Sequence, residues 1–353
     1  MDLHLRRRCR GRTPARLDVM TSFAGRDLDM VQVMILSLAD AHPRDEIRFW
    51  LFEQNIPAPQ IRALAEFCAG LGNVTLHPVR VPDAAAFGRL RELGGKPDSA
   101  RFLWFVAHQH LPGDLDRVIY LDATDIIVAG DLVPLLHHPF MGKYLIACRE
   151  FTDLPPLLIG GARRAHACGL PSGLIRHISR GLINSGAIVL NLRKLRRDGI
   201  GIGHYLDTAE WAHDRLRLGF GDQGLFSLTH GSHYTRLHDR YNHRFYAESP
   251  KRIMRDPAVI HFAGQVLKPA FWRLSKEHEC LVLDRLRRSG SPILRLNQRL
   301  PLRAAHLPYL RRWWEICART PSHARLEPEA TARMTAALSQ WDREGGTDPK
   351  ATR

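Results

Sequence analysis

Short apolar runs and segments of helical periodicity alternate along the first half of the chain. The runs 17–22, 47–52 and 73–79 have the length and composition of buried strands. Between them, apolar residues recur at helical spacing in 30–38 and in 61–71. Strand alternating with helix predicts an α/β fold built on a mostly parallel, doubly wound sheet.

The stretch 117–132 carries the most informative pattern. Its apolar run Val118–Leu121 predicts another buried strand that ends at Asp122, and a second acid, Asp125, follows before a further apolar run. Ligands of open α/β sheets bind at the carboxyl ends of the strands. Two carboxylates there are suited to Mg²⁺ or Mn²⁺ shared with substrate phosphates. A solvated acidic turn is the alternative, and these residues alone leave both open.

The second half continues the alternation less regularly. Further strands are predicted at 144–148, 187–192 and 258–262, and helices at 102–110 and from 220 to 229. The segment 152–179 is rich in Pro, Gly and Arg and shows no clear period, so it is predicted to be a long loop over a site. From 276 to 319 the pattern becomes helical and strongly basic.

These patterns divide the chain into four parts. We expect a disordered basic arm over 1–16, an α/β catalytic domain over 17–275, a basic helical extension over 276–344 and a disordered tail over 345–353. No apolar run reaches the roughly 18 residues that a membrane-spanning helix needs. The basic start also lacks the apolar core of a secretory signal. We therefore expect a cytoplasmic protein.

Composition narrows the class of partner. The 353 residues are 44% hydrophobic and 25% charged, as in a soluble globular protein, and the formal net charge of +15 favours an anionic partner. A nucleic acid is the weakest choice, because the arginines are spread along the chain and no basic–aromatic motif accompanies them. Six cysteines without a C-x-x-C pair predict reduced thiols rather than disulfides or a zinc site.

Four motifs occur in a fixed order. They are YLDATDIIVAGDL from Tyr120, LINSGAIVLNL from Leu182, GDQGLF from Gly221 and IHFAGQVLKP from Ile260. In this order the chain, from about 17 to 272, resembles the retaining family-8 glycosyltransferases, which include bacterial lipopolysaccharide galactosyl- and glucosyltransferases and glycogenin. The resemblance implies the GT-A fold, a Rossmann-like mixed and mostly parallel sheet flanked by helices.

The resemblance also implies a metal site. Asp122 matches the first acid of the family's D-x-D motif, and His261 matches the histidine that completes the protein ligands of Mn²⁺. The second acid belongs two positions after the first, where Thr124 stands, and the carboxylate comes one residue later at Asp125. A bulge at 123–124 would restore its aim. The implied ligands of Mn²⁺ or Mg²⁺ are therefore Asp122, Asp125 and His261. A weakened metal site is the alternative, and a histidine satisfied in the core is the alternative for His261.

The implied donor site uses residues from all of these motifs. Matched to the family, the catalytic residues are Asn184, Asp222 and Gln223, and the donor-binding residues are Thr21, Ser22, Arg26, Arg101, Asp122, Ser185, Gly264 and Lys268. Lys268 would neutralise the diphosphate. Trp104 stands where many members carry an arginine, and Arg101 lies one turn earlier on the same predicted helix. Without the resemblance, Asn184–Gly186 is an ordinary tight turn and Asp222 a helix N-cap.

The implied activity is metal-dependent transfer of glucose or galactose from a UDP-sugar with retention of configuration. The implied acceptor is a saccharide, lipid-linked or part of lipopolysaccharide. Arginines beside Trp313 and Trp314 suit docking on an anionic inner membrane; alternatively, the two tryptophans pack on the catalytic domain. A different class of function also stays open, a GT-A scaffold that binds nucleotide or glycan without turnover, because the second acid is displaced.

Overall fold

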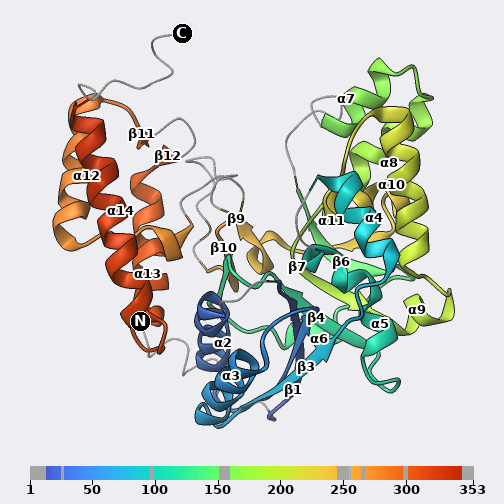
Figure 1. Ribbon diagram of the computed structural model, residues 1–353, viewed down its shortest axis with the longest axis horizontal. Helices are drawn as coiled ribbons and strands as arrows, with labels where there is room; N and C mark the ends of the chain where they lie inside the picture. The colour runs from blue at the N-terminus through green and yellow to red at the C-terminus, as the bar shows by residue number, and fades with distance from the viewer. Residues whose placement is uncertain are drawn as a thin grey trace.

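A seven-stranded sheet is the frame of the molecule (Figure 1). The computed structural model describes residues 13–24, 28–95, 99–150, 160–244, 254, 256–263, 268–296 and 301–343. The strands of this sheet are β1 Arg16–Ser22, β2 Glu46–Glu53, β3 Val74–Arg80, β4 Arg117–Leu121, β6 Leu145–Arg149, β7 Ile183–Asn191 and β8 Tyr234–Arg236. Their order is β3-β2-β1-β4-β7-β6-β8, and β7 runs antiparallel to both β4 and β6 while the other pairs are parallel. The expected mixed, mostly parallel sheet is confirmed.

Helices cover both faces of the sheet. In the first two thirds of the chain they are α2 Asp29–Ala41, α3 Ala58–Gly70, α4 Ala85–Gly94, the 3₁₀ helix η1 Ala100–Val106, α5 Ala107–His110, α6 Pro134–His137, α7 Gly160–Ala167, α8 Ser172–Gly181, α9 Leu192–Arg197, α10 Ile202–Leu216 and α11 Asp222–His230. Helices α2 and α3 pack on one face, and α4, η1, α5, α10 and α11 pack on the other. The fold is therefore a three-layer α/β structure.

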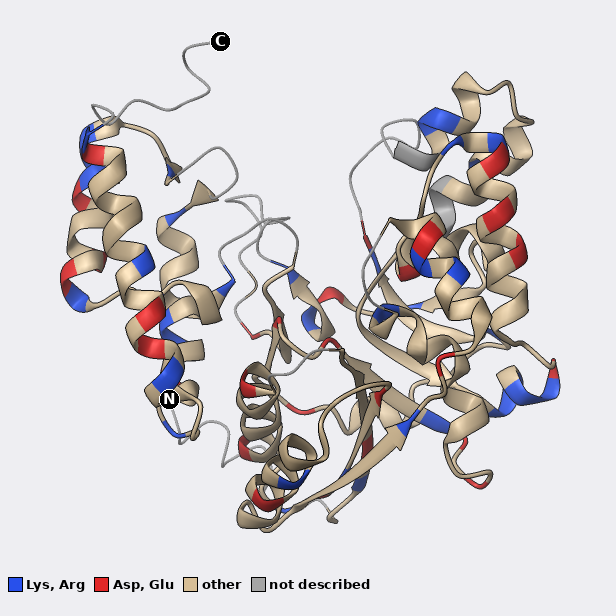
Figure 2. Ribbon diagram, in the orientation of Figure 1, with Lys and Arg blue, Asp and Glu red and all other residues tan. Residues whose placement is uncertain are grey.

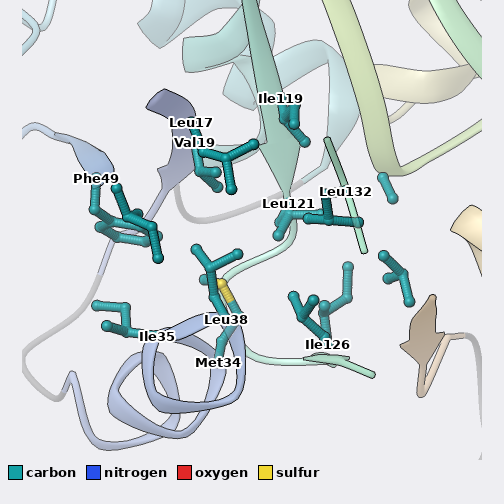
Figure 3. Packing of buried hydrophobic residues seen from close by; sticks show 14 of the residues in the cluster. Leu17, Val19, Met34, Ile35, Leu38, Phe49, Ile119, Leu121, Ile126 and Leu132 are labelled. Carbon is teal, nitrogen blue, oxygen red and sulfur yellow. The ribbon is translucent and has the colours of Figure 1, made fainter. Parts of the chain in front are cut away.

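Along each central strand, successive side chains pack alternately against the helices on one face of the sheet and those on the other. Leu17 and Val19 of β1 pack against α2, where Figure 3 shows them beside Leu38, whereas Met20 packs on the opposite face with the aromatic residues of η1. Strand β4 alternates in the same way. Because both faces are buried, these strands appear in the sequence as continuous apolar runs.

A second, small sheet lies beside the first and consists of β5 Ile126–Val128, β9 His243–Arg244 and β10 Val259–His261, in the order β5-β10-β9. The chain leaves β4 at Asp122, bends over 123–125 and enters β5, which pairs antiparallel with β10 so that Ile126 lies opposite His261. The connection is thus a bend between two sheets. The bulge considered at 123–124 does not form, because Asp122 follows β4 and Asp125 precedes β5, and no single strand contains both.

The long loop predicted over 152–179 is also wrong where the structure describes it. Residues 160–167 and 172–181 form α7 and α8, and 151–159 lie outside the described residues. Ala162, Ala165 and Ile178 pack against α10 and α11 in a core of their own. Small alanines at helical spacing supply this face, and the interrupting glycines and proline obscure its period.

The C-terminal part is helical, as expected, and packs on the α/β domain. It contains the short 3₁₀ helix η5 Pro269–Phe271, α12 Lys276–Ser289, the strand pair β11 Leu294–Arg295 and β12 Pro301–Leu302, α13 Leu307–Cys317 and α14 His323–Arg343. Trp313 and Trp314 are 1% and 2% exposed and share a core with Val33 and Leu36 of α2. Of the two alternatives for these tryptophans, packing against the α/β domain is therefore confirmed, and they do not face a membrane.

The charges of this part are mixed rather than uniformly basic. Figure 2 shows Lys or Arg and Asp or Glu interspersed on α12 and α14. Ion pairs join Arg319 to Asp40 and Arg325 to Asp29, both between the C-terminal part and α2. Within the described residues, no helix is long and apolar enough to span a membrane.

Replacing Trp313 with alanine tests this core. The side chain is large and buried, so we expect the free energy of unfolding to fall by about 3–5 kcal/mol. Denaturant-induced unfolding measures it. Leu283→Ala is the control, because Leu283 is 41% exposed on neighbouring α12 and its loss should cost less than about 0.5 kcal/mol. Equal losses in the two variants would contradict the packing.

Candidate active site

Side chains from four elements meet at the carboxyl end of β4. Asp122 follows β4, and its backbone N–H donates to the Gly186 carbonyl of β7 at 2.9 Å. The backbone N–H of Ser185 reaches Gln223 Oε1 of α11 at 3.4 Å. His261, at the end of β10, places Nε2 3.7 Å from Asp122 Oδ2. The structure thus gathers residues of all four sequence motifs in one place.

The segment Asn184–Gly186 belongs to strand β7 and carries an irregularity. Ala147 of β6 pairs with Ile188, but the next residue, Cys148, pairs with Asn184. The residues between these pairs therefore bulge away from β6, as bulges near active sites do when they redirect side chains. The tight turn considered from sequence is wrong, because these residues lie within the strand.

The His261 ring lies so close to the backbone at position 186 that only glycine fits there. A Cβ built on it would lie 2.0 Å from Cε1 of His261. Its backbone angles are not unusual, so the constraint is space rather than conformation. The absence of a side chain lets the imidazole lie directly on the strand.

Asp122 is enclosed among polar and acidic neighbours. Tyr120 donates its hydroxyl to Asp122 Oδ1 at 2.9 Å, and Ser22 Oγ lies 3.2 Å from the same tyrosine hydroxyl. Although 33% of its side chain is exposed, burial of the carboxyl, with repulsion from Asp222 and Asp125, raises the pKa of Asp122 to about 7. The site therefore concentrates negative charge that a cation would relieve.

Asp222 begins α11 and is held by Trp104. The indole Nε1 donates to Asp222 Oδ2 at 3.1 Å, and Ser185 also hydrogen-bonds the carboxylate. Burial raises the pKa of Asp222, while the hydrogen bonds and the charge of Arg101 oppose the rise. Trp104 thus occupies the place expected for an arginine and binds the acid through its N–H.

Arg101 reaches the same space because the expected helix is a 3₁₀ helix in this part. With three residues per turn, Arg101 and Trp104 lie on one face of η1. A guanidinium Nη of Arg101 lies near Gly221, at the start of α11. Its Nε is buried and, among the described residues, has no hydrogen-bond partner. This arginine is suited to an anionic group of a ligand.

Asp125 and Lys268 form an ion pair. Lys268 also donates to the Phe262 carbonyl at 2.7 Å, and Thr124 donates to Asp125 Oδ1 at 3.0 Å. The Asp125 carboxylate is therefore engaged by Lys268 and Thr124. Across the described ranges, no three His, Cys, Asp or Glu side chains are grouped as a bound metal ion would need.

Asp122 and His261 nevertheless fit a divalent cation. Burial and the nearby charges of Lys268 and Arg244 lower the pKa of His261, so its ring is neutral. A neutral imidazole and a carboxylate are the mixed nitrogen and oxygen donors that suit Mn²⁺. The residues present therefore supply two ligands, and Asp125 would become a third only by leaving Lys268.

Three residues that no motif marks complete the site. Asn184 donates from Nδ2 to Glu150 Oε2 at 2.6 Å, and Arg244 binds the same carboxylate at 3.2 Å. Asn242 lies between Asn184 and His261, 2.7 Å from Asn184 Oδ1 and 2.8 Å from His261 Nδ1. All three lie near strand ends of β6 and β9, where sequence spacing shows no pattern.

The turn after β1, predicted to bind the donor, contributes fewer contacts to the site than the other segments. The Thr21 hydroxyl donates to the Leu121 carbonyl at 2.7 Å, which ties β1 to β4. Ser22 connects to Asp122 through Tyr120. Arg26 and Gly264 lie outside the described residues.

Comparisons with known proteins concern the family and the fold. A model of glycosyl transferase family 8 matches residues 22–273. No curated protein matches the chain.

Several solved structures share the fold. The apo bifunctional glycosyltransferase WbbM matches 89% of this chain and 51% of its own, at 15% identity and a TM-score of 0.56. GlyE of Streptococcus pneumoniae TIGR4 matches 96% of this chain and 66% of its own, at 17% identity and a TM-score of 0.52. The galactosyltransferase LgtC, solved with donor and acceptor sugar analogues, matches 73% of this chain and 89% of its own, at 20% identity and a TM-score of 0.50.

The Gly186→Ala variant tests the contact with His261. The added methyl overlaps the imidazole, so we expect His261 to move and the free energy of unfolding to fall by about 1–3 kcal/mol. Thermal and denaturant unfolding measure this loss. Gly203→Ala is the matched control, because a Cβ there meets nothing within 4 Å. A Gly186→Ala variant as stable as this control would contradict the close approach.

The raised pKa of Asp122 predicts a pH dependence of stability in EDTA. Its pKa rises from the ordinary 3.8 to about 7 on folding, so ionisation of Asp122 destabilises the folded state. This destabilisation is absent below about pH 4 and complete above about pH 7. Asp122→Asn should therefore become more stable than wild type as the pH rises through this window. Melting temperatures measure the difference. Asp214→Asn, with a side chain 75% exposed, should show no such trend, and a pH-independent effect of Asp122→Asn would refute the shift.

Proposed function

This chain belongs to glycosyltransferase family 8, and we propose that it transfers a hexose from a UDP-sugar to a saccharide, with retention of configuration and with Mn²⁺ or Mg²⁺. That it is a glycosyltransferase follows from the family model, which covers residues 22–273. The finer proposal is carried by one observation: Asp122, His261 and Asp222 converge with Asn184 and Ser185 at the carboxyl end of β4. This edge is where open α/β sheets bind nucleotides.

In the proposed donor site, Asp122 and His261 would hold the metal ion. When bound, the ion supplies charge stabilisation to the departing diphosphate. Lys268 contributes its ammonium to the same group. It lies within reach of this function because it already pairs with a site carboxylate, Asp125. Asp125 would have to leave Lys268 to serve as a third ligand of the ion. Arg101 adds a second cation near Asp222.

The sugar lies between β7 and α11. Asp222 accepts hydrogen bonds from the donor hydroxyls, and its own position is fixed by Trp104 and Ser185. Gln223 lies near the anomeric carbon and is tied to β7 through the Ser185 N–H. Because no further carboxylate is assigned as a nucleophile, the acceptor attacks on the face from which the diphosphate leaves. The leaving phosphate takes the proton of the acceptor. Such a reaction needs positioning and charge stabilisation above all.

The proposed acceptor is a saccharide of lipopolysaccharide or of another surface glycan, and the proposed transferred hexose is glucose or galactose. The support is the resemblance of the four motifs to bacterial family members. A peripheral membrane contact would have to use groups other than Trp313 and Trp314, which are buried.

One observation favours a second function. The ion pair between Asp125 and Lys268 ties up both groups that the transfer needs. A scaffold that binds nucleotide or glycan without turnover would keep this pair closed.

Calorimetric titration of UDP, with Mn²⁺ and then with EDTA, tests the proposal. We expect wild type to bind at least about 10-fold more tightly with Mn²⁺. Asp122→Asn should lose this difference because a metal ligand is removed. Asp125→Ala should lose it too if Asp125 leaves Lys268 for the metal. Asp222→Asn should keep its affinity for UDP yet hydrolyse UDP-glucose or UDP-galactose about 100-fold more slowly.

The exposed Asp214→Asn is the control for both measurements. Absence of UDP binding in wild type would refute the donor proposal. Metal-dependent binding without hydrolysis or transfer would instead support the scaffold.

A further inference from the structure

A chain of hydrogen bonds with only one possible direction runs through the site. It starts at the backbone N–H of Gly186, which donates to Asn184 Oδ1 at 3.1 Å. A backbone N–H has no other role, so the atom it meets must be the amide oxygen. The other end of the Asn184 amide meets Glu150 Oε2, a carboxylate that Arg244 also binds. A carboxylate beside an arginine accepts, so that end must be the NH₂ group. The orientation of Asn184 is thus determined.

The direction passes on to Asn242. One end of its amide lies 2.7 Å from Asn184 Oδ1 and must therefore be the donating NH₂ group. The other end is then the oxygen, and it lies 2.8 Å from His261 Nδ1. An amide oxygen accepts only, so His261 Nδ1 carries the proton. The tautomer of this histidine follows from a backbone N–H two amides away.

The consequence appears at the opposite nitrogen. A neutral ring protonated on Nδ1 has a lone pair on Nε2, and Nε2 faces Asp122 Oδ2 at 3.7 Å. When Asp122 is ionised, two electron-pair donors then face each other. The other tautomer would place an N–H between them and close the gap with a hydrogen bond. Only the Nδ1–H form directs the Nε2 lone pair and a carboxylate oxygen at the same point, where a cation can bind both.

We propose that Asn242 is a positioning residue that holds His261 in its Nδ1–H tautomer and so directs the Nε2 lone pair at the metal ion. The part that concerns the metal rests on the proposed function; the tautomer itself does not. Histidine ligands of metals generally need such a partner on the second ring nitrogen. Here the partner also contacts Asn184, so one amide connects the metal side of the site to the sugar side.

A purely structural role is the competing explanation. Asn242 is 0% exposed, and any change there disturbs packing between β7 and the small sheet. Asn242→Asp separates the two roles, because it keeps an oxygen for His261 Nδ1–H but loses the donor to Asn184. Asn242→Ala loses both.

The tautomer is measured first, on the wild-type full chain in EDTA. Nitrogen-15 labelled histidines give distinct shifts for protonated and unprotonated ring nitrogens, and His261→Gln identifies the signals of His261. We expect Nδ1 protonated and Nε2 unprotonated near neutral pH. An Nε2–H form, or an even mixture of the two, would overturn the proposal. This result needs no variant at 242 and holds whether or not the chain transfers a sugar.

Mn²⁺ affinity, measured by electron paramagnetic resonance, is the second readout. We expect Asn242→Ala to bind Mn²⁺ about 10- to 100-fold more weakly, and Asn242→Asp to stay within about 3-fold of wild type although it unfolds more easily. Asn73→Ala is the matched control, since it removes a hydrogen-bonded amide that contacts His42 and Asp45, away from the site. It should lose stability without losing Mn²⁺.

Two results would contradict the positioning role: wild-type affinity in Asn242→Ala, or equal losses in both variants at 242. If Asn242→Ala does not fold, the wild-type tautomer and Asn242→Asp decide. If wild type binds no Mn²⁺, the proposed metal site fails, while the tautomer measurement still decides the hydrogen-bond chain.

Discussion

The contact of the His261 ring with the bare backbone of Gly186 holds the site together. It joins the two sheets of the domain, because Gly186 lies in the bulged part of β7 and His261 ends β10. The bend after Asp122 makes this approach possible by carrying the chain from β4 into β5, the partner of β10. Asp122, His261, Asn184 and Ser185 are therefore neighbours through backbone geometry. A side chain at 186 would separate them.

The charge of the site is balanced locally. Three carboxylates lie close together in the site, those of Asp122, Asp125 and Asp222. Burial, together with repulsion from the other two, raises the pKa of Asp122. Lys268 and Arg101 offset part of this charge. A cluster of this kind is costly in a chain without ligand and becomes favourable with a divalent cation and a diphosphate. The same balance explains why Lys268, the group proposed to meet the diphosphate, pairs with Asp125.

The C-terminal helices support the site indirectly, by packing on helix α2. Trp313 and Trp314 extend the core of α2, and the ion pairs of Arg319 and Arg325 attach the extension to the same helix. Helix α2 in turn packs under β1 and β5. The net charge of +15 thus includes arginines that bind the molecule's own acids. A basic composition alone is a poor guide to a membrane or nucleic-acid partner.

The sequence by itself determined the alternation of strands and helices in the first half of the chain, the position of Asp122 at a strand end and, through the four motifs, the family. These features are local: apolar runs mark buried strands, and motif residues keep their spacing. Tertiary structure decided the rest. Asn242, Glu150 and Arg244 enter the site only because β6, β9 and β10 end near one another, and no spacing along the chain records that. Gly186 resembles a turn residue in the sequence, but it is needed for a ring that comes from 75 positions away along the chain, Gly186 to His261. The helices at 160–181 escaped prediction because their small apolar faces have meaning only against α10 and α11. Local periodicity reports what a segment buries, whereas the partner it is buried against is set by the packing of the whole chain.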